Sequence, residues 1–185
     1  MSLVNLPDLP SPAAARKRSF APVVDAAVRV LVLGSLPGDA SLARGQYYGH
    51  PQNRFWHLMG AVVGVDLPPL DYAARLAALL AAHVGLWDVI AEARRAGSLD
   101  GNIRDRANND LVSLLATLPH LHTIAFNGGT AARIGMKALQ QQAGRYRIVS
   151  LPSSSPAYTL AYSEKLAAWL ALRDEALGTS AGRDS

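Results

Sequence analysis

The chain has 185 residues, half of them hydrophobic and only 17% charged, which predicts one domain with a hydrophobic core and excludes disorder over most of its length. It contains no cysteine, which excludes disulfides, thiol nucleophiles, cysteine-bound zinc and iron–sulfur clusters. Its formal net charge of +4 is compatible with a nucleic-acid partner and does not require one.

The two ends of the sequence differ in composition from the rest. Residues 1–20 contain three prolines and lack hydrophobic periodicity, which predicts a flexible lead-in. Residues 178–185 predict a flexible tail, which leaves one domain over residues 21–177. The lead-in lacks the apolar segment of a signal peptide, and the longest apolar run, residues 76–84, is too short to cross a bilayer. We therefore expect a cytoplasmic protein with no membrane partner.

Short apolar segments alternate with segments of helical spacing along the chain. The first, residues 28–33, is β-branched and continuous, as in a strand buried on both faces. Three further strands are predicted at residues 83–87, 121–126 and 146–151. Helices are predicted over residues 53–63, 72–82, 89–96, 109–118, 130–143 and 163–177. Strands separated by helices favour an α/β fold, here a three-layer α/β/α sandwich around a four-stranded, mostly parallel sheet.

Four unusual segments follow the predicted strands directly. They are residues 34–38 (GSLPG), 87–88 (WD), 126–129 (FNGG) and 151–156 (LPSSSP). Ligands of open α/β sheets bind outside the carboxyl ends of the strands. The four segments are therefore expected to converge on one site.

Residues 34–56 form a long polar connection in which four aromatic residues fall within ten positions. Long irregular connections are usually functional or disordered, and clustered aromatic residues argue against disorder. Phe55 and Trp56 open a helical pattern, which favours a place in the core. Tyr47 and Tyr48 fit equally well an anchor to the core and a stacking surface for a base.

Each polar residue at the predicted edge also has a structural interpretation. Asn53 fits the N-cap of the helix that follows, a role compatible with a catalytic amide. Asp88 fits the N-cap of the helix predicted from residue 89. Asn127 fits a plain turn or an anion site at a helix N-terminus. Serines 153–155 fit either a loop without a binding role or a phosphate-binding loop.

Other common catalytic signatures are missing from the sequence. It has neither a P-loop nor a G-x-S-x-G nucleophile elbow. His120 and His122 lie away from the predicted edge and have no carboxylate nearby in the sequence, so no metal site is expected. Taken alone, these features favour a nucleotide-binding or sugar-processing α/β protein.

Six segments, taken in order, carry a family resemblance. They are GSLPG (34–38), QYYGHPQNRFW (46–56), GLWDV (85–89), GSLDGNI (97–103), FNGG (126–129) and LPSSSPA (151–157). Together they resemble the uracil-DNA glycosylase superfamily and, within it, most of all the hypoxanthine-DNA (deoxyinosine) glycosylase family. The resemblance covers residues 28–169. The superfamily's α/β/α sandwich around a four-stranded parallel sheet agrees with the fold predicted from the pattern.

The resemblance implies a monofunctional DNA-repair enzyme. Such an enzyme flips a deaminated base, most of all hypoxanthine, out of DNA and hydrolyses its N-glycosidic bond, leaving an abasic site. The sugar passes through an oxocarbenium-like state, and the departing base must have its negative charge stabilised. No cofactor or metal is implied, DNA containing the deaminated base is the partner, and a monomer suffices for this chemistry.

By the same resemblance, Asn53 in the HP-x-N stretch orients or polarises the attacking water. In the mismatch-type relatives an Asn of the first block has this role, whereas residues 34–38 contain no Asn and Ser35 follows the first glycine. This departure speaks against strong general uracil excision. An amide is a weak base, so the expected contribution is positioning and electrostatics.

The remaining site residues are also expected from the resemblance. Tyr48 matches the aromatic residue that stacks on the flipped base, and Tyr158 is the expected wedge in the vacated stack, with Ala157 and Leu160 as alternatives. The base pocket is expected to comprise Gly34, Ser35, Pro37, Gly38, Tyr48, Asp88 and Asn127. Contacts to DNA are expected from His50, Ser153, Ser154, Ser155 and Tyr158.

Two alternatives share the fold. One is a mismatch-type uracil or thymine glycosylase, and the other is a DNA-binding relative that has lost catalysis. The sequence does not rank hypoxanthine, xanthine and uracil as substrates, because base choice depends on the shape of the pocket.

Overall fold

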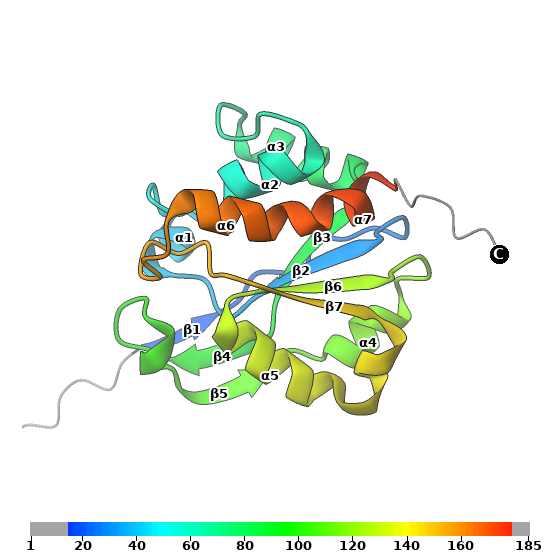
Figure 1. Cartoon of the computed structure of the whole chain (residues 1–185). Helices are drawn as coiled ribbons and strands as arrows, with labels where there is room; N and C mark the ends of the chain where they lie inside the picture. Colours follow the sequence, from blue (N-terminus) through cyan, green and yellow to red (C-terminus); the bar gives the residue numbers. More distant parts are fainter. Residues whose placement is uncertain (1–14, 179–185) are drawn as a thin grey trace, which may run out of the picture.

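A four-stranded sheet forms the centre of the computed structural model, which describes residues 15–178 (Figure 1). Its strands lie in the order β3-β2-β6-β7, and every neighbouring pair is parallel. They are β2 (Val30–Gly34), β3 (Val84–Asp88), β6 (Thr123–Asn127) and β7 (Arg147–Leu151). The predicted α/β fold with a four-stranded parallel sheet is confirmed.

Helices cover both faces of this sheet, which gives the three predicted layers (Figure 1). One face carries α2 (Phe55–Val63), α3 (Tyr72–Ala81), α6 (Tyr162–Trp169) and α7 (Arg173–Leu177). The other face carries α4 (Leu111–Ala116) and α5 (Gly129–Leu139). A short helix, α1 (Asp39–Arg44), follows β2, and 3-10 turns span Asp100–Asn102, Gln140–Arg145 and Leu170–Leu172.

Side chains of β2 alternate between the two faces and so belong to two hydrophobic clusters. Val30 and Val32 pack in the cluster that contains Phe55 and Trp169. Leu31 and Leu33 pack on the other face, in the cluster that also contains side chains of α4 and α5. Because both faces are covered, the strand is buried throughout, which explains its uninterrupted apolar sequence.

One glycine sets the distance between a helix and the sheet. A Cβ atom at Gly135 in α5 would lie 2.1 Å from Cε1 of Phe126 in β6. The missing side chain therefore lets α5 settle directly on the aromatic ring. This contact fixes the end of β6 that leads into Asn127.

The helix predicted over residues 89–96 is wrong. This segment forms β4 (Ile90–Arg94), which pairs with β1 (Arg16–Arg18) and β5 (Arg104–Asn108) in a three-stranded antiparallel sheet of order β1-β4-β5. The pairing is non-local, joining Arg16 to Arg94 and Ile90 to Asn108. Hydrogen bonds to distant strands override the local helical spacing.

The end of the predicted lead-in takes part in the fold. Arg16–Arg18 form a strand, and Val23 bridges to Leu86 of β3, so the ordered fold begins before residue 21. Residues 1–14 of the predicted lead-in and residues 179–185 of the predicted tail lie outside the described residues. The other predicted strands and helices all begin within two residues of their expected starts.

Within residues 15–178, the model contains no helix of the length and apolar character that crossing a bilayer requires.

Candidate active site

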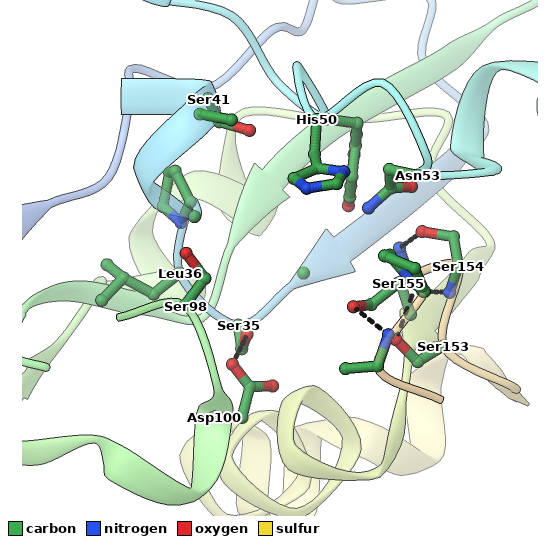
Figure 2. Close-up of a pocket in the computed structure, with 18 of the residues that line it drawn as sticks. Ser35, Leu36, Ser41, His50, Asn53, Ser98, Asp100, Ser153, Ser154 and Ser155 are labelled. Atoms are coloured by element: carbon green, nitrogen blue, oxygen red, sulfur yellow. Dashed lines mark hydrogen bonds between the residues drawn. The ribbon is translucent and has the colours of Figure 1, made fainter. Parts of the chain in front are cut away.

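A cavity of about 400 Å³ opens at the carboxyl ends of β2, β3, β6 and β7 (Figure 2). Its size is typical of a small-molecule site, and its place matches the rule for open α/β sheets. All the site residues expected from the sequence line it. They are Gly34, Ser35, Pro37, Gly38, Tyr48, His50, Asn53, Asp88, Asn127, Ser153, Ser154, Ser155 and Tyr158. The structure therefore brings these residues together, while their individual roles remain predictions.

Gly34, the last residue of β2, lies directly beside the side chains of Asp88 and Tyr48. Its register partner across the ladder is Asp88 at the end of β3. A Cβ atom at Gly34 would lie 2.6 Å from Oδ1 of Asp88 and 2.9 Å from the hydroxyl oxygen of Tyr48. Only a residue without a side chain leaves room for this arrangement.

Tyr48 is held between the core and the cavity. Its backbone is left-handed, with φ +54°, and its ring stacks on Phe55 with centroids 3.7 Å apart. Its buried hydroxyl has no hydrogen-bond partner among the described residues. Burial, and then the nearby Asp88, raise the pKa of this hydroxyl and the side chain of Asn127 opposes the shift, so the hydroxyl stays protonated as a donor.

The neighbouring aromatic residues belong mainly to the core. Phe55 and Trp56 are buried, as their helical spacing predicts. Tyr47, for which two interpretations were open, is buried and donates its hydroxyl to the carbonyl of Ala21 at 3.0 Å. It thus anchors the connection between β2 and α2, although it also lines part of the cavity.

Asp88 is a buried acid without a paired cation at hydrogen-bond distance. Its Oδ2 atom has no hydrogen-bond partner among residues 15–178. Burial is the main cause that raises its pKa to about 7, and Asp100 adds to the shift while Arg95 opposes it. Near neutral pH the group is therefore substantially protonated. The N-cap interpretation of Asp88 is wrong, because no helix follows and the chain enters β4.

Asn53 offers one side of its amide to the cavity. Its Oδ1 atom accepts a hydrogen bond from the N–H of Phe55 at 2.9 Å, so the amide does satisfy a donor in the first turn of α2. Since this oxygen is occupied, the Nδ2 group is the part left to donate into the cavity, beside His50 (Figure 2). His50 is exposed, and its Nδ1 atom accepts from the N–H of Gln52.

The serine loop after β7 is fastened to the end of β6 by Asn127. The Asn127 amide donates to Oγ of Ser154 and accepts from its N–H, both at 2.9 Å. Ser154 is buried, and its carbonyl accepts from the N–H of Arg54. Asn127 and Ser154 therefore support the loop, which is more than the plain turn considered from the sequence. Ser153 and Ser155 keep hydroxyl hydrogens to offer, since each Oγ accepts a backbone N–H.

One wall of the cavity was not predicted from the sequence as part of the site. It comes from the β4–β5 connection and contains Ser98, Leu99 and Asp100. Ser35 donates its hydroxyl to Oδ1 of Asp100 at 2.8 Å (Figure 2). The turn-forming composition of residues 97–102 was the available signal. Because residues 89–96 were predicted as a helix, the sequence did not indicate that β4 and β5 pair and bring their connection to the edge of the central sheet.

A buried arginine joins this wall to the loop after β2. The side chain of Arg95 is fully buried, lies 3.7 Å from Asp100, and donates to the carbonyls of Leu36 and Pro37. Burial lowers its pKa and Asp100 raises it. These bonds fix residues 34–38 against the second sheet.

Acidic and imidazole groups do not gather into a metal site in the described part of the chain. Among residues 15–178 no three His, Asp or Glu side chains are arranged to hold a metal ion. His122, one of the two histidines considered from the sequence, lies 3.4 Å from Glu175.

Comparison with known proteins identifies related sequences and structures. Residues 21–176 match the family model of the uracil DNA glycosylase superfamily. A hypoxanthine DNA glycosylase of Methanosarcina barkeri is 44% identical over 113 residues, which is 61% of this chain and 72% of that protein. A hypoxanthine DNA glycosylase of Methanosarcina acetivorans is 41% identical over 141 residues, 76% of this chain and 87% of that protein. The solution NMR structure of a candidate uracil DNA glycosylase from Methanosarcina acetivorans is 38% identical, with a TM-score of 0.77 over 87% of this chain and 99% of that one.

The buried Asp88 predicts a pH-dependent stability. Its pKa rises from an ordinary 3.8 to about 7 on folding, so the stability linked to its neutral form is lost as pH rises through about 7. Asp88→Asn removes the ionisation. The free energy of unfolding of the variant, relative to wild type, should therefore increase by about 1–3 kcal/mol from pH 5 to pH 8. Denaturant unfolding at both pH values measures the difference.

Asp71→Asn is the control for this measurement. Asp71 caps α3 at the surface by accepting from the N–H of Ala74, and asparagine caps equally well. This variant should follow the wild type at both pH values. A difference for Asp88→Asn that does not change with pH would contradict the titration assigned to Asp88.

Proposed function

Because this chain belongs to the uracil DNA glycosylase superfamily and is a DNA glycosylase, we propose that it excises hypoxanthine from DNA by hydrolysis of the N-glycosidic bond. The two sequence relatives are both named hypoxanthine DNA glycosylase, whereas the related NMR structure is named as a candidate uracil DNA glycosylase.

The observation that carries the proposal is that two buried polar groups lining the cavity have hydrogen-bonding capacity that the described residues leave unused. The hydroxyl of Tyr48 and Oδ2 of Asp88 are buried without hydrogen-bond partners among the described residues. Each such group costs free energy until a ligand completes its hydrogen bonds. A neutral carboxyl group carries one donor and one acceptor, and the amide edge of hypoxanthine offers O6 as an acceptor and N1–H as a donor. Asp88 in its neutral form therefore matches this edge with two hydrogen bonds.

The flipped base would stack on the cavity side of Tyr48. The other side of that ring stacks on Phe55 with nearly parallel planes, which fixes the orientation of the Tyr48 ring. Stacking on an aromatic side chain contributes about 1–3 kcal/mol per base. As the bond to the sugar breaks, negative charge develops on the base, and a protonated Asp88 stabilises it by donating a hydrogen bond.

Asn53 would position the water that attacks the sugar. With Oδ1 bonded to Phe55, its Nδ2 group donates to the water oxygen and fixes its place. The amide takes no proton, so its contribution is alignment and electrostatics. The exposed His50 and the hydroxyls of Ser153 and Ser155 lie at the mouth of the cavity, where they can contact phosphates. Tyr158, which is 49% exposed, is the proposed wedge in the vacated stack.

Excision from defined duplexes tests the proposed substrate. End-labelled duplexes that each carry one hypoxanthine, xanthine or uracil are incubated with the protein and then cleaved by alkali at abasic sites. We expect the fastest single-turnover excision at hypoxanthine. Faster excision at uracil would contradict the proposed base and favour the mismatch-type alternative. Binding without excision of any base would favour a non-catalytic relative.

Replacement of Asn53 tests its role in positioning water. Asn53→Ala should lower single-turnover excision at least ~100-fold, the scale of one lost polar contact to a transition state. Binding to a duplex with an uncleavable analogue should change little. Asp71→Ala, which removes a helix cap outside the cavity, controls for the lost bond to Phe55. Equal activity losses in the two variants would assign Asn53 a capping role only.

The ionisation of Asp88 predicts the pH profile of excision. Since the neutral form donates to the base, the wild-type rate should fall as pH rises through about 7. Asp88→Asn keeps a donor and an acceptor but does not ionise. Its excision rate should therefore lack the fall that the wild type shows between pH 6 and pH 9. Ionisation of the base itself affects both proteins equally. A wild-type rate that rises over this range would contradict a neutral Asp88.

A further inference from the structure

Two large hydrophobic side chains stand exposed at the mouth of the cavity. Among the exposed large hydrophobic residues of the described chain, only Leu99 and Tyr158 line the cavity. Leu99 is 56% exposed and Tyr158 is 49% exposed. Single exposed leucines are common on protein surfaces, so the position of Leu99 at the site is the informative feature.

The two residues belong to opposite walls. Leu99 lies in the β4–β5 connection between Ser98 and Asp100, and Tyr158 ends the serine loop after β7. Figure 2 shows Ser98 and Asp100 on one side of the cavity and Ser153–Ser155 on the other. A base that enters the cavity must pass between these walls.

The loop that carries Leu99 is held on both sides of it. The hydroxyl of Ser98 accepts from the N–H of Asp39 at 2.9 Å, and Asp100 accepts from Ser35 at 2.8 Å. The carbonyl of Gly97 accepts from Lys17 and from Arg95. These bonds join the loop to α1, to the loop after β2 and to β1. The exposure of Leu99 is therefore imposed by a fixed backbone.

The surroundings of Leu99 suit a nucleic-acid duplex. Arg104 and Arg106 lie on β5, whose residues are all exposed. Arg104 donates to the carbonyl of Gly101 in the same connection. Arg104 therefore places a guanidinium group next to Gly101, two residues after Leu99, where it can attract a phosphate close to an apolar side chain of the kind that enters a base stack.

We propose that Leu99 is a second DNA wedge, which packs against the bases left exposed at the flip site from the wall opposite Tyr158. This inference rests on the proposed excision of a flipped base from duplex DNA. Extrusion of a base removes two stacking contacts, and apolar side chains that cover the exposed faces keep the extruded state populated. In single-stranded DNA no paired stack has to be held open, so the contribution of Leu99 should vanish there.

The test compares duplex and single-stranded substrates with matched leucine variants. Leu99→Ala should lower single-turnover excision from a hypoxanthine duplex about 10-fold and leave excision from the same unpaired strand within about twofold. Leu177, which is 44% exposed on α7, is the control. Leu177→Ala should leave both rates unchanged. Thermal unfolding confirms that each variant is folded.

Two outcomes of this comparison would overturn the proposal. An equal loss on both substrates would mean that Leu99 contacts the flipped nucleotide itself and not the duplex. Unchanged excision from duplex by Leu99→Ala would mean that the side chain contacts no DNA that matters for the reaction.

A binding measurement separates this inference from the choice of base. Fluorescence anisotropy with a duplex that contains a tetrahydrofuran abasic analogue requires no excision. Leu99→Ala should weaken this binding about 5–10-fold relative to Leu177→Ala. If the wild type excises uracil faster than hypoxanthine and this difference persists, the proposed substrate fails and the wedge stands. Equal binding by the two variants would overturn the wedge whichever base is excised.

Discussion

The close approach of Asp88 and Tyr48 at Gly34 is the constraint on which the site depends. Parallel pairing of β2 with β3 places Asp88 beside Gly34, and the left-handed backbone of Tyr48 brings its hydroxyl to the same point. Both groups are removed from water and have no hydrogen-bond partner within residues 15–178. Folding thus includes the free-energy cost of removing these groups from water, and the proposed base would offset that cost by completing their hydrogen bonds. Groups arranged in this way need no reorganisation during the reaction, which is the basis of electrostatic catalysis.

The small antiparallel sheet has a direct part in this arrangement. Arg95, at its junction with the site, is fully buried and donates to the carbonyls of Leu36 and Pro37. A buried cation is tolerated only where oxygen atoms surround it, and here carbonyls and Asp100 supply them. The same connection contributes Asp100, which accepts from Ser35, and Leu99 at the mouth. The second sheet therefore positions the first loop of the site and extends the surface that we propose to face DNA.

Polar residues around the cavity fall into two groups according to whether the fold uses their hydrogen-bonding capacity. Asn127 and Ser154 bind each other through two hydrogen bonds and support the serine loop. Asn53 uses only its oxygen, through the bond to Phe55, and keeps Nδ2 for the cavity. Asp88 keeps Oδ2 unpaired. The second group is the one to which the proposed chemistry assigns contacts with water and base.

Local sequence pattern is enough to predict the central sheet and the location of the site. Strands buried on both faces need uninterrupted apolar runs, and parallel strands bring their carboxyl ends to one edge, so local pattern suffices for both conclusions. It did not determine β4, because that strand depends on pairing with β1, which is distant in the chain, and with β5. Nor did it determine the ionisation of Asp88, which burial and the returning Asp100 decide. Only the tertiary structure fixed these features, because desolvation and non-local hydrogen bonds exist only after distant segments have come together.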